Sequence, residues 1–200
     1  PWLDFTIHRP EVWVRTFTEA QEALGALRNG EAPSTDLDRL HTRLLRMAIT
    51  RQETFLDLVR EYLPLPRLIQ ILQRMIGTGL IGGKSLGMLL ARAVLARTAE
   101  GWAEKLERHD SFFIGSDVFY TYLVQNDCWW LRRRSPGMTM AEVLENVALA
   151  REKLLAGTFP SDIRHQFMEM LNYFGQSPII VRSSSLLEDN YGNAFSGKYD

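Results

Sequence analysis

Hydrophobic residues recur every three to four positions over most of the first third of the chain. In residues 11–28 this spacing places an apolar stripe along one side of a helix, and Gly30 follows as a stop signal. The same spacing over residues 36–63 predicts a second helix, which Pro64 ends because proline cannot continue the hydrogen-bonding pattern. We therefore expect residues 1–76 to form a helical N-terminal region.

The middle of the chain alternates strand signals with helix signals. SFFIG at residues 111–115 predicts a short strand, and Ser116 is placed to cap the helix that follows. Thr139 and Glu142 occupy the first and fourth positions of a capping box, which predicts the start of another helix.

One more helix and one more strand are expected near the end of the chain. The helix should follow Pro160, with Gly175 as its stop. The apolar run in PIIVRSSS then predicts a buried strand over residues 179–182.

A glycine cluster, GTGLIGGKSLGM, occupies residues 77–88. A helix is expected directly after it, from Ser85 to about Leu106. Glycines let backbone N–H groups approach a phosphate without a Cβ in the way, and a helix N-terminus adds partial positive charge. With Lys84 supplying a full charge, the cluster predicts an anion-binding loop, although glycines can also simply break a helix.

Two general nucleotide-binding motifs fit this cluster poorly. A Walker A loop requires glycine where Thr78 stands. Gly77, Gly79 and Gly82 do satisfy the dinucleotide fingerprint, with Glu100 at about the distance of a ribose contact. The preceding segment, LPRLIQILQRMI, has a helical rather than a strand pattern, which argues against that fingerprint.

Two longer segments resemble a known enzyme family. GGKSLGMLLA at residues 82–91 is similar to the Gly-Gly-Lys-Gly-Ala loop near the start of the ATP-binding domain of pyruvate phosphate dikinase and phosphoenolpyruvate synthase. PIIVRSSSLLEDNYGNAFSGKY at residues 178–199 resembles that family's P-V-A-V-R-S-S-A-T-A-E-D motif and the F-A-G-Q segment after it. Between them, FFIGSDVFYTYL resembles the strand and helix that the family has there.

With the helical first third, the resemblance implies an α+β fold. Residues 1–76 would be the helical N-terminal region, and residues 77–200 the first part of an ATP-grasp-like nucleotide-binding domain with a small sheet. The implied activity is ATP-dependent phosphoryl transfer through a histidine on a separate domain toward pyruvate. ATP would bind with Mg²⁺, and the metal ligands, the phosphohistidine domain and the pyruvate-binding domain would lie outside this chain. We therefore expect the chain to be inactive alone.

The resemblance also implies roles for single residues. Lys84 would contact the ATP phosphates, and Gly82 and Gly83 would allow close backbone approach. Arg182, the candidate catalytic residue, would offer its planar guanidinium to phosphate oxygens; from the residues alone, it could instead form a buried ion pair with a following carboxylate. Residues 195–198 resemble a mobile segment that covers the phosphates. The candidate nucleotide-binding set is Gly82, Gly83, Lys84, Arg182, Ser183, Glu188, Asp189, Gly197 and Lys198.

Departures from the family pattern leave other functions open. Ser85 replaces a glycine, SLL at residues 185–187 replaces Ala-Thr-Ala, and Lys198 replaces glutamine. A non-catalytic nucleotide-sensing regulatory module is therefore one alternative. The other is a helical interaction domain, which predicts exposed apolar stripes on the N-terminal helices and a stable oligomer.

Composition narrows the class of protein further. The 23 Lys and Arg balance 24 Asp and Glu, for a formal charge of -1, so no overall field attracts nucleic acid or an anionic membrane. Arg132–Arg134 beside Trp129 and Trp130 imitates a nucleic-acid patch, but three basic residues are typical of a solvated face. No apolar run approaches about 18 residues, so no membrane span is expected.

Cysteine and histidine usage points to a cytoplasmic protein without a metal centre. Cys128, the single cysteine, cannot form an internal disulfide, and its apolar neighbours suit a buried, reduced thiol. The histidines lack the spacing of a metal cage, so none is expected to be a ligand. They are His8, His41, His109 and His165. Because Pro1 opens the chain, we expect it to be an excised piece of a longer protein.

Overall fold

The chain forms two compact units, Pro1–Gly115 with Ile180–Asp200 and Ser116–Ile179, and each is described by itself. Over the residues that the structure describes, the fold is mostly helical with two small two-stranded sheets, which confirms the predicted α+β class. The computed structural model describes residues 10–33, 36–98, 101–106, 110–132, 139–184, 189–190 and 193–194.

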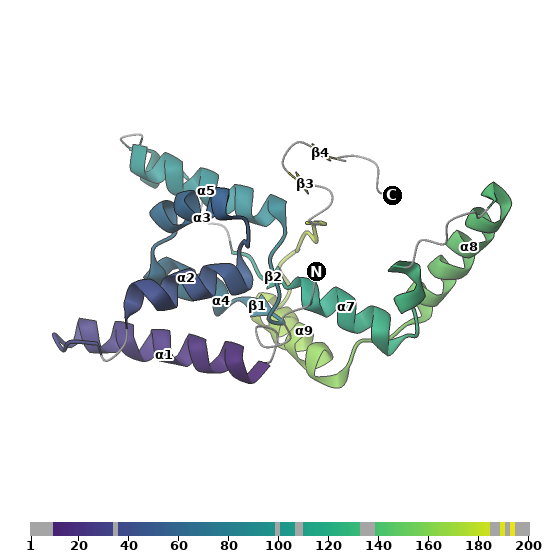
Figure 1. The fold of residues 1–200 in the computed structure, drawn as a ribbon, viewed down its shortest axis with the longest axis horizontal. Coiled ribbons are helices and arrows are strands. Elements are labelled where there is room, and N and C mark those ends of the chain that lie inside the picture. The colour runs from purple at the N-terminus through teal and green to yellow at the C-terminus, as the bar shows by residue number, and fades with distance from the viewer. Residues whose placement is uncertain are drawn as a thin grey trace. The chain divides into compact units, whose positions relative to one another are not determined.

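Four helices pack together at the start of the first unit (Figure 1). They are α1 (Pro10–Arg28), α2 (Leu37–Ala48), α3 (Glu53–Tyr62) and α4 (Leu65–Leu72). Their apolar stripes bury one another, since each contributes a side chain with no exposed surface: Ala20, Leu44, Val59 and Leu68. The helix predicted over residues 11–28 is confirmed, and Gly30 beyond its end has a φ of 78°.

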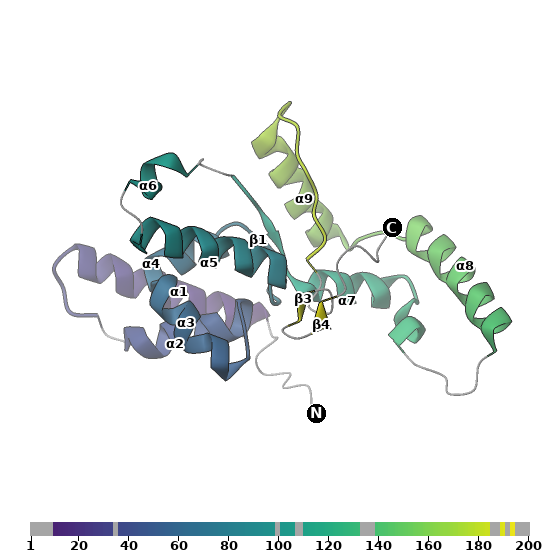
Figure 2. The same ribbon diagram turned by 90° about the horizontal axis from the view of Figure 1, so that it is seen from above.

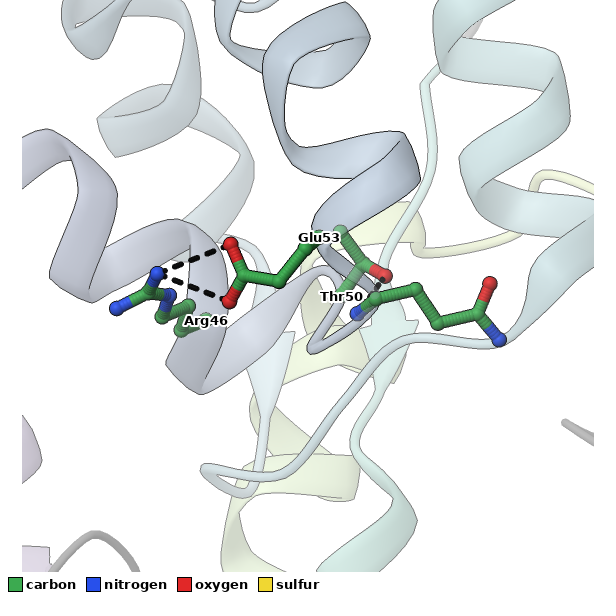
Figure 3. Close-up of polar contacts among 4 residues, drawn as sticks. Arg46, Thr50 and Glu53 are labelled. Carbon is green, nitrogen blue, oxygen red and sulfur yellow. Dashed lines mark hydrogen bonds and ion pairs between the residues drawn. The ribbon is translucent and has the colours of Figure 1, made fainter.

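The single helix predicted over residues 36–63 is wrong, because the chain turns between α2 and α3. The backbone N–H of Gln52 donates to Thr50 Oγ1 at 3.1 Å, and the Arg46 guanidinium pairs with the Glu53 carboxylate across the turn at 2.9 Å (Figure 3). A threonine hydroxyl that accepts a nearby backbone N–H competes with helix continuation. The turn brings Leu56 of α3 into the core.

A short parallel sheet and two further helices follow in this unit. β1 (Met75–Ile76) pairs in parallel with β2 (Phe113–Ile114), Met75 opposite Phe113, so the strand predicted at 111–115 is confirmed. Between them lie α5 (Gly83–Thr98) and α6 (Trp102–Lys105). The helix predicted from Ser85 to about Leu106 is thus two helices, separated at Gly101, whose φ of 76° favours glycine.

Helix α5 and the glycine loop share the core of the four N-terminal helices. α5 packs alongside α3 (Figure 2), and Arg97 donates to the Glu61 carbonyl at 2.6 Å. Ile81, in the glycine loop, is buried, and its N–H donates to the carbonyl of Ala48 at the end of α2, 2.8 Å away. The N-terminal helices therefore hold the loop that precedes α5.

The second unit contains α7 (Ser116–Gln125), the 3₁₀ helix η1 (Trp129–Arg132), α8 (Met140–Ala156) and α9 (Ser161–Phe174). The capping box predicted before α8 is confirmed, with Thr139 Oγ1 accepting the Glu142 N–H and the Glu142 carboxylate accepting the Thr139 N–H. The helix predicted after Pro160 is confirmed as well, and Gly175 follows it with a φ of 59°.

The buried strand predicted over residues 179–182 is wrong. This segment has no regular structure, and the side chains of Ile180 and Val181 are 87% and 80% exposed. An apolar run becomes a buried strand only beside a paired strand and beneath a covering layer. Among the described residues β1 and β2 pair only with each other, and β3 (Asp189–Asn190) pairs only with β4 (Asn193–Ala194).

Candidate phosphate-binding site

A cavity of about 340 Å³ in the first unit brings together the two motifs that the sequence singles out. It is formed by the first turns of α5, by the residues that lead into β2 and by residues 180–184. The described lining residues are Lys84, Ser85, Gly87, Met88, Ser111, Phe112, Phe113, Ile180, Arg182, Ser183 and Ser184.

The path of the chain from β1 into α5 positions Lys84. β1 ends at Ile76, and Gly77 turns the chain with a φ of 81°, a left-handed value that glycine adopts without strain. The N–H of Leu86 then donates to the Gly82 carbonyl at 3.0 Å, so Lys84 lies in the first turn of α5. A helix N-terminus carries partial positive charge, which adds to the lysine ammonium.

Gly82 is needed where the glycine loop meets the segment that carries Arg182. A Cβ added at Gly82 would overlap the carbonyl oxygen of Ser184, so no larger residue fits without moving that backbone. In this structure the atom close to Gly82 is therefore the Ser184 carbonyl oxygen, whereas the sequence had suggested a phosphate of the ligand. Gly83, the other predicted glycine of the pair, is the first residue of α5.

Hydrogen bonds from Ser85 reinforce the contact between the two segments. The Ser85 N–H donates to Ser184 Oγ at 3.2 Å, and the two hydroxyl oxygens lie 3.4 Å apart. Ser85 stands where the resembled loop has glycine, and here its hydroxyl faces Ser184. The consequence is that the first turn of α5 and residues 180–184 form one wall of the cavity.

The charges along this cavity favour an anion. Lys84 is partly buried, whereas Arg182 and Ser183 are exposed, so Arg182 does not lie at the end of a buried strand as predicted. The described lining residues include two cations and no carboxylate. A guanidinium and an ammonium at one cavity can serve a phosphate group, the first as a planar fork and the second as a compact charge.

The same cavity does not fit a metal ion. Mg²⁺ prefers carboxylate and phosphate oxygens, and the lining side chains supply only hydroxyl oxygens. Throughout the part of the chain that the structure describes, no three His, Cys, Asp or Glu side chains are grouped so that they could hold a metal.

Several predicted site residues lie where the structure describes little or nothing. Glu188, Gly197 and Lys198 are outside the described residues, as is Glu100 of the dinucleotide fingerprint. Only the backbone of Asp189 is described, in β3.

Of the described lining residues, only Lys84, Arg182 and Ser183 belong to the predicted set, and those outside it include Ser111, Phe112 and Ser184. Ser111 and Phe112 directly precede β2, beside an ion pair between Arg74 and Asp110. The only sequence signal for them was their place at the start of a predicted strand. By resemblance, Ser184 was expected to shape the loop after the predicted strand together with Ser183, but it was not assigned to the nucleotide-binding set.

The remaining candidates for chemistry have structural surroundings. His41 is buried in α2, where its Nε2 lies 2.8 Å from the Leu63 carbonyl, so it is a core histidine. Cys128 is buried, as predicted. His8 and His109 lie outside the described residues, as do Arg133 and Arg134 of the basic run. In the described part of the chain no helix is both long and apolar enough to cross a membrane.

Comparison with known proteins identifies the family. No curated protein and no solved structure matches the chain. The family model described as pyruvate phosphate dikinase, AMP/ATP-binding domain, matches residues 78–200, which include the glycine loop, α5, β2 and the Arg182 segment. The match covers more than half of the chain and confirms the resemblance of its motifs. The chain therefore belongs to the pyruvate phosphate dikinase family, through that family's AMP/ATP-binding domain.

Proposed function

We propose that this chain is the ATP-binding part of an ATP-dependent phosphotransferase of the pyruvate phosphate dikinase and phosphoenolpyruvate synthase kind. Residues 77–200 are the first part of its ATP-grasp-like domain, and residues 1–76 are a helical region that supports the glycine loop. The observation that carries the proposal is that Lys84 and Arg182, from two motifs far apart in sequence, line the same cavity.

In this proposal Lys84 and Arg182 hold the phosphates of ATP. Lys84 contributes a point charge at the start of α5, where the helix N-terminus adds to it. Arg182, as the catalytic residue, neutralises charge on the transferred phosphoryl group with its two-pronged guanidinium. Phosphoryl transfer depends mainly on positioning the phosphates and on neutralising their charge. Lys84 and Arg182 can do both.

The other proposed site residues complete the nucleotide site. Gly82 and Gly83 shape the loop, and Ser183 borders the cavity beside Arg182. By resemblance, Glu188 and Asp189 shape the following loop, and Gly197 and Lys198 belong to a segment over the phosphates. By resemblance, the ligands of Mg²⁺ are expected outside this chain.

The acceptor chemistry also belongs to other domains. We propose that a phosphohistidine domain and a pyruvate-binding domain of the same protein receive the phosphoryl group, so this chain is inactive alone. A cytoplasmic location would give the protein its ATP.

The binding of a non-hydrolysable ATP analogue, measured by calorimetry on a chain extended through the rest of the nucleotide domain, tests the proposal. Lys84→Ala and Arg182→Ala should each weaken binding by roughly tenfold or more, since a hydrogen bond to a charged group contributes about 1.5–3 kcal/mol. Lys105→Ala is a matched control, because Lys105 is exposed in α6 over the ring of Trp102 and outside the cavity.

Unchanged affinity in both cavity variants would remove the phosphate roles assigned to them. Equal weakening in the Lys105→Ala control would show that only the net charge of the chain matters, and it would also contradict the proposal.

A further inference from the structure

A second and larger cavity lies in the N-terminal helices, well separated in sequence from the glycine loop. Its volume is about 640 Å³, and side chains of α1, α2 and α3 line it. We call it the arginine cleft. Its described lining residues are Val12, Arg15, Asp38, Arg39, Thr42, Arg43, Arg46, Met47 and Arg60, none of which lines the Lys84 cavity.

The arginine cleft has an excess of positive charge. Among its described lining residues Asp38 is the only carboxylate, against five arginines. Three of these arginines have carboxylate partners. Arg60 pairs with Asp38 at 3.0 Å, Arg46 with Glu53 at 2.9 Å, and Arg15 with Glu19 at 3.9 Å. These ion pairs account for three positive charges and leave two.

Arg39 and Arg43 carry the uncompensated charges. Within the described residues neither forms an ion pair. They are four residues apart on α2, so they lie on one helix face, where two like charges repel each other. Arg46 continues the row one turn later. A bound anion would relieve this repulsion between Arg39 and Arg43.

The shape of the cleft indicates the kind of anion. Its volume falls within the range of roughly 300–1,000 Å³ that is typical of small-molecule sites. The lining residues of α2 run from Asp38 to Met47, about 13 Å at the helical rise, which is longer than one phosphate group. Guanidinium groups bind phosphate oxygens through paired hydrogen bonds. Val12, which is half-buried, adds apolar surface for the rest of a ligand.

We propose that the arginine cleft binds a small molecule with more than one phosphate group, and that Arg39 and Arg43 are its main contacts. This site is separate from the proposed ATP site and does not depend on it. An acidic protein segment could use the same charges, but the limited volume of the cleft and the short row of arginines favour a small ligand.

Inorganic tripolyphosphate is the probe for a direct test. The starting protein is the 200-residue chain with Lys84→Ala and Arg182→Ala, so that the proposed ATP site cannot contribute. We expect it to bind tripolyphosphate in calorimetry and to lose at least tenfold in affinity when Arg39→Gln and Arg43→Gln are added. The matched control, Arg28→Gln with Arg67→Gln, removes the same two charges from exposed positions outside the cleft and should change affinity less than twofold.

Three results would overturn the proposal. They are no binding of tripolyphosphate by the starting protein, equal affinity with and without Arg39 and Arg43, and an equal loss in the control. Binding of a hexaglutamate peptide without binding of tripolyphosphate would assign the cleft to an acidic protein partner instead. Circular dichroism checks that the variants fold, and if the double variant does not, Arg39→Gln at its exposed position carries the same test.

Discussion

At the scale of single residues, His41 illustrates how burial determines the charge of a side chain. It is buried on α2 and contacts the Leu63 carbonyl through Nε2. Burial lowers its pKa below the usual value of 6.5, and Arg60 lowers it further. The contact with Leu63 and the nearby Asp38 act in the opposite direction but do not compensate. Neutral His41 is therefore the form that the folded chain prefers.

This preference predicts a loss of stability in mild acid. Above the usual pKa the proton has no effect, because His41 is neutral in both the folded and the unfolded chain. As the pH falls through 6.5 toward the lowered folded pKa, the unfolded chain binds a proton more readily, and the free energy of unfolding decreases. Urea unfolding at about pH 7.5 and about pH 5.5 measures this decrease.

His41→Gln is the matched variant, because its side-chain amide keeps a donor for the Leu63 carbonyl and does not titrate. It should show a smaller decrease than the unsubstituted chain. An equal decrease in both would assign the pH dependence to other groups.

Part of the candidate site could be predicted residue by residue. Lys84, Arg182 and Ser183 belong to contiguous motifs whose residue types suit a phosphate, and all three line one cavity. Ser111 could not be singled out, and the contact that Ser184 makes with the glycine loop could not be predicted, because both depend on how distant segments meet. The Ser184 carbonyl beside Gly82 is a tertiary contact that no local pattern encodes.

At the scale of elements, the helix ends that carry a local capping or stop signal were predicted correctly. The capping box of Thr139 and Glu142 and the glycine stops after α1 and α9 act within one turn of the chain, and the structure contains all three. The break between α2 and α3 was missed because the apolar period is similar on both sides of it. The strand predicted over residues 179–182 was wrong because a strand requires a neighbouring strand to pair with. The apolar run in the sequence does not show whether such a neighbour is present.

Gly82→Ala tests the close contact between the glycine loop and residues 180–184. The added methyl group would overlap the Ser184 carbonyl, so it should reduce stability by about 1–3 kcal/mol, the usual range for overpacking. Gly25→Ala is the control, since Gly25 lies within α1 with no atom within 4 Å of the added Cβ. The control should stabilise the chain by about 0.5–1 kcal/mol.

Urea unfolding followed by circular dichroism measures both glycine variants. If Gly82→Ala were as stable as Gly25→Ala, residues 180–184 would not press against the loop as described.

At the scale of the whole molecule, burial is uneven between the two units. α2 and α4 of the first unit bury many apolar side chains in one shared core. In the second unit the described buried side chains of α8 and α9 are Ala150 and Ile163. The first unit also carries both cavities for which we propose ligands.

Hydrogen exchange should follow this difference. Amides in α2 and α4 are expected to exchange at least tenfold more slowly than those in α8 and α9, because sparse burial permits local opening at low free energy. Mass spectrometry of the exchanged chain gives the rates by segment. Equally slow exchange in α8 and α9 would mean that the second unit has a core of its own.

The central claim is that Lys84 and Arg182 act together on the phosphates of one nucleotide. The most direct measurement compares the affinities of a non-hydrolysable ATP analogue and of adenosine for the extended chain and for its Lys84→Ala, Arg182→Ala double variant. We predict that the variant binds the analogue roughly a hundredfold more weakly, from two lost charged contacts, and adenosine as before. An unchanged affinity for the analogue, or an equal loss for both ligands, would contradict the claim.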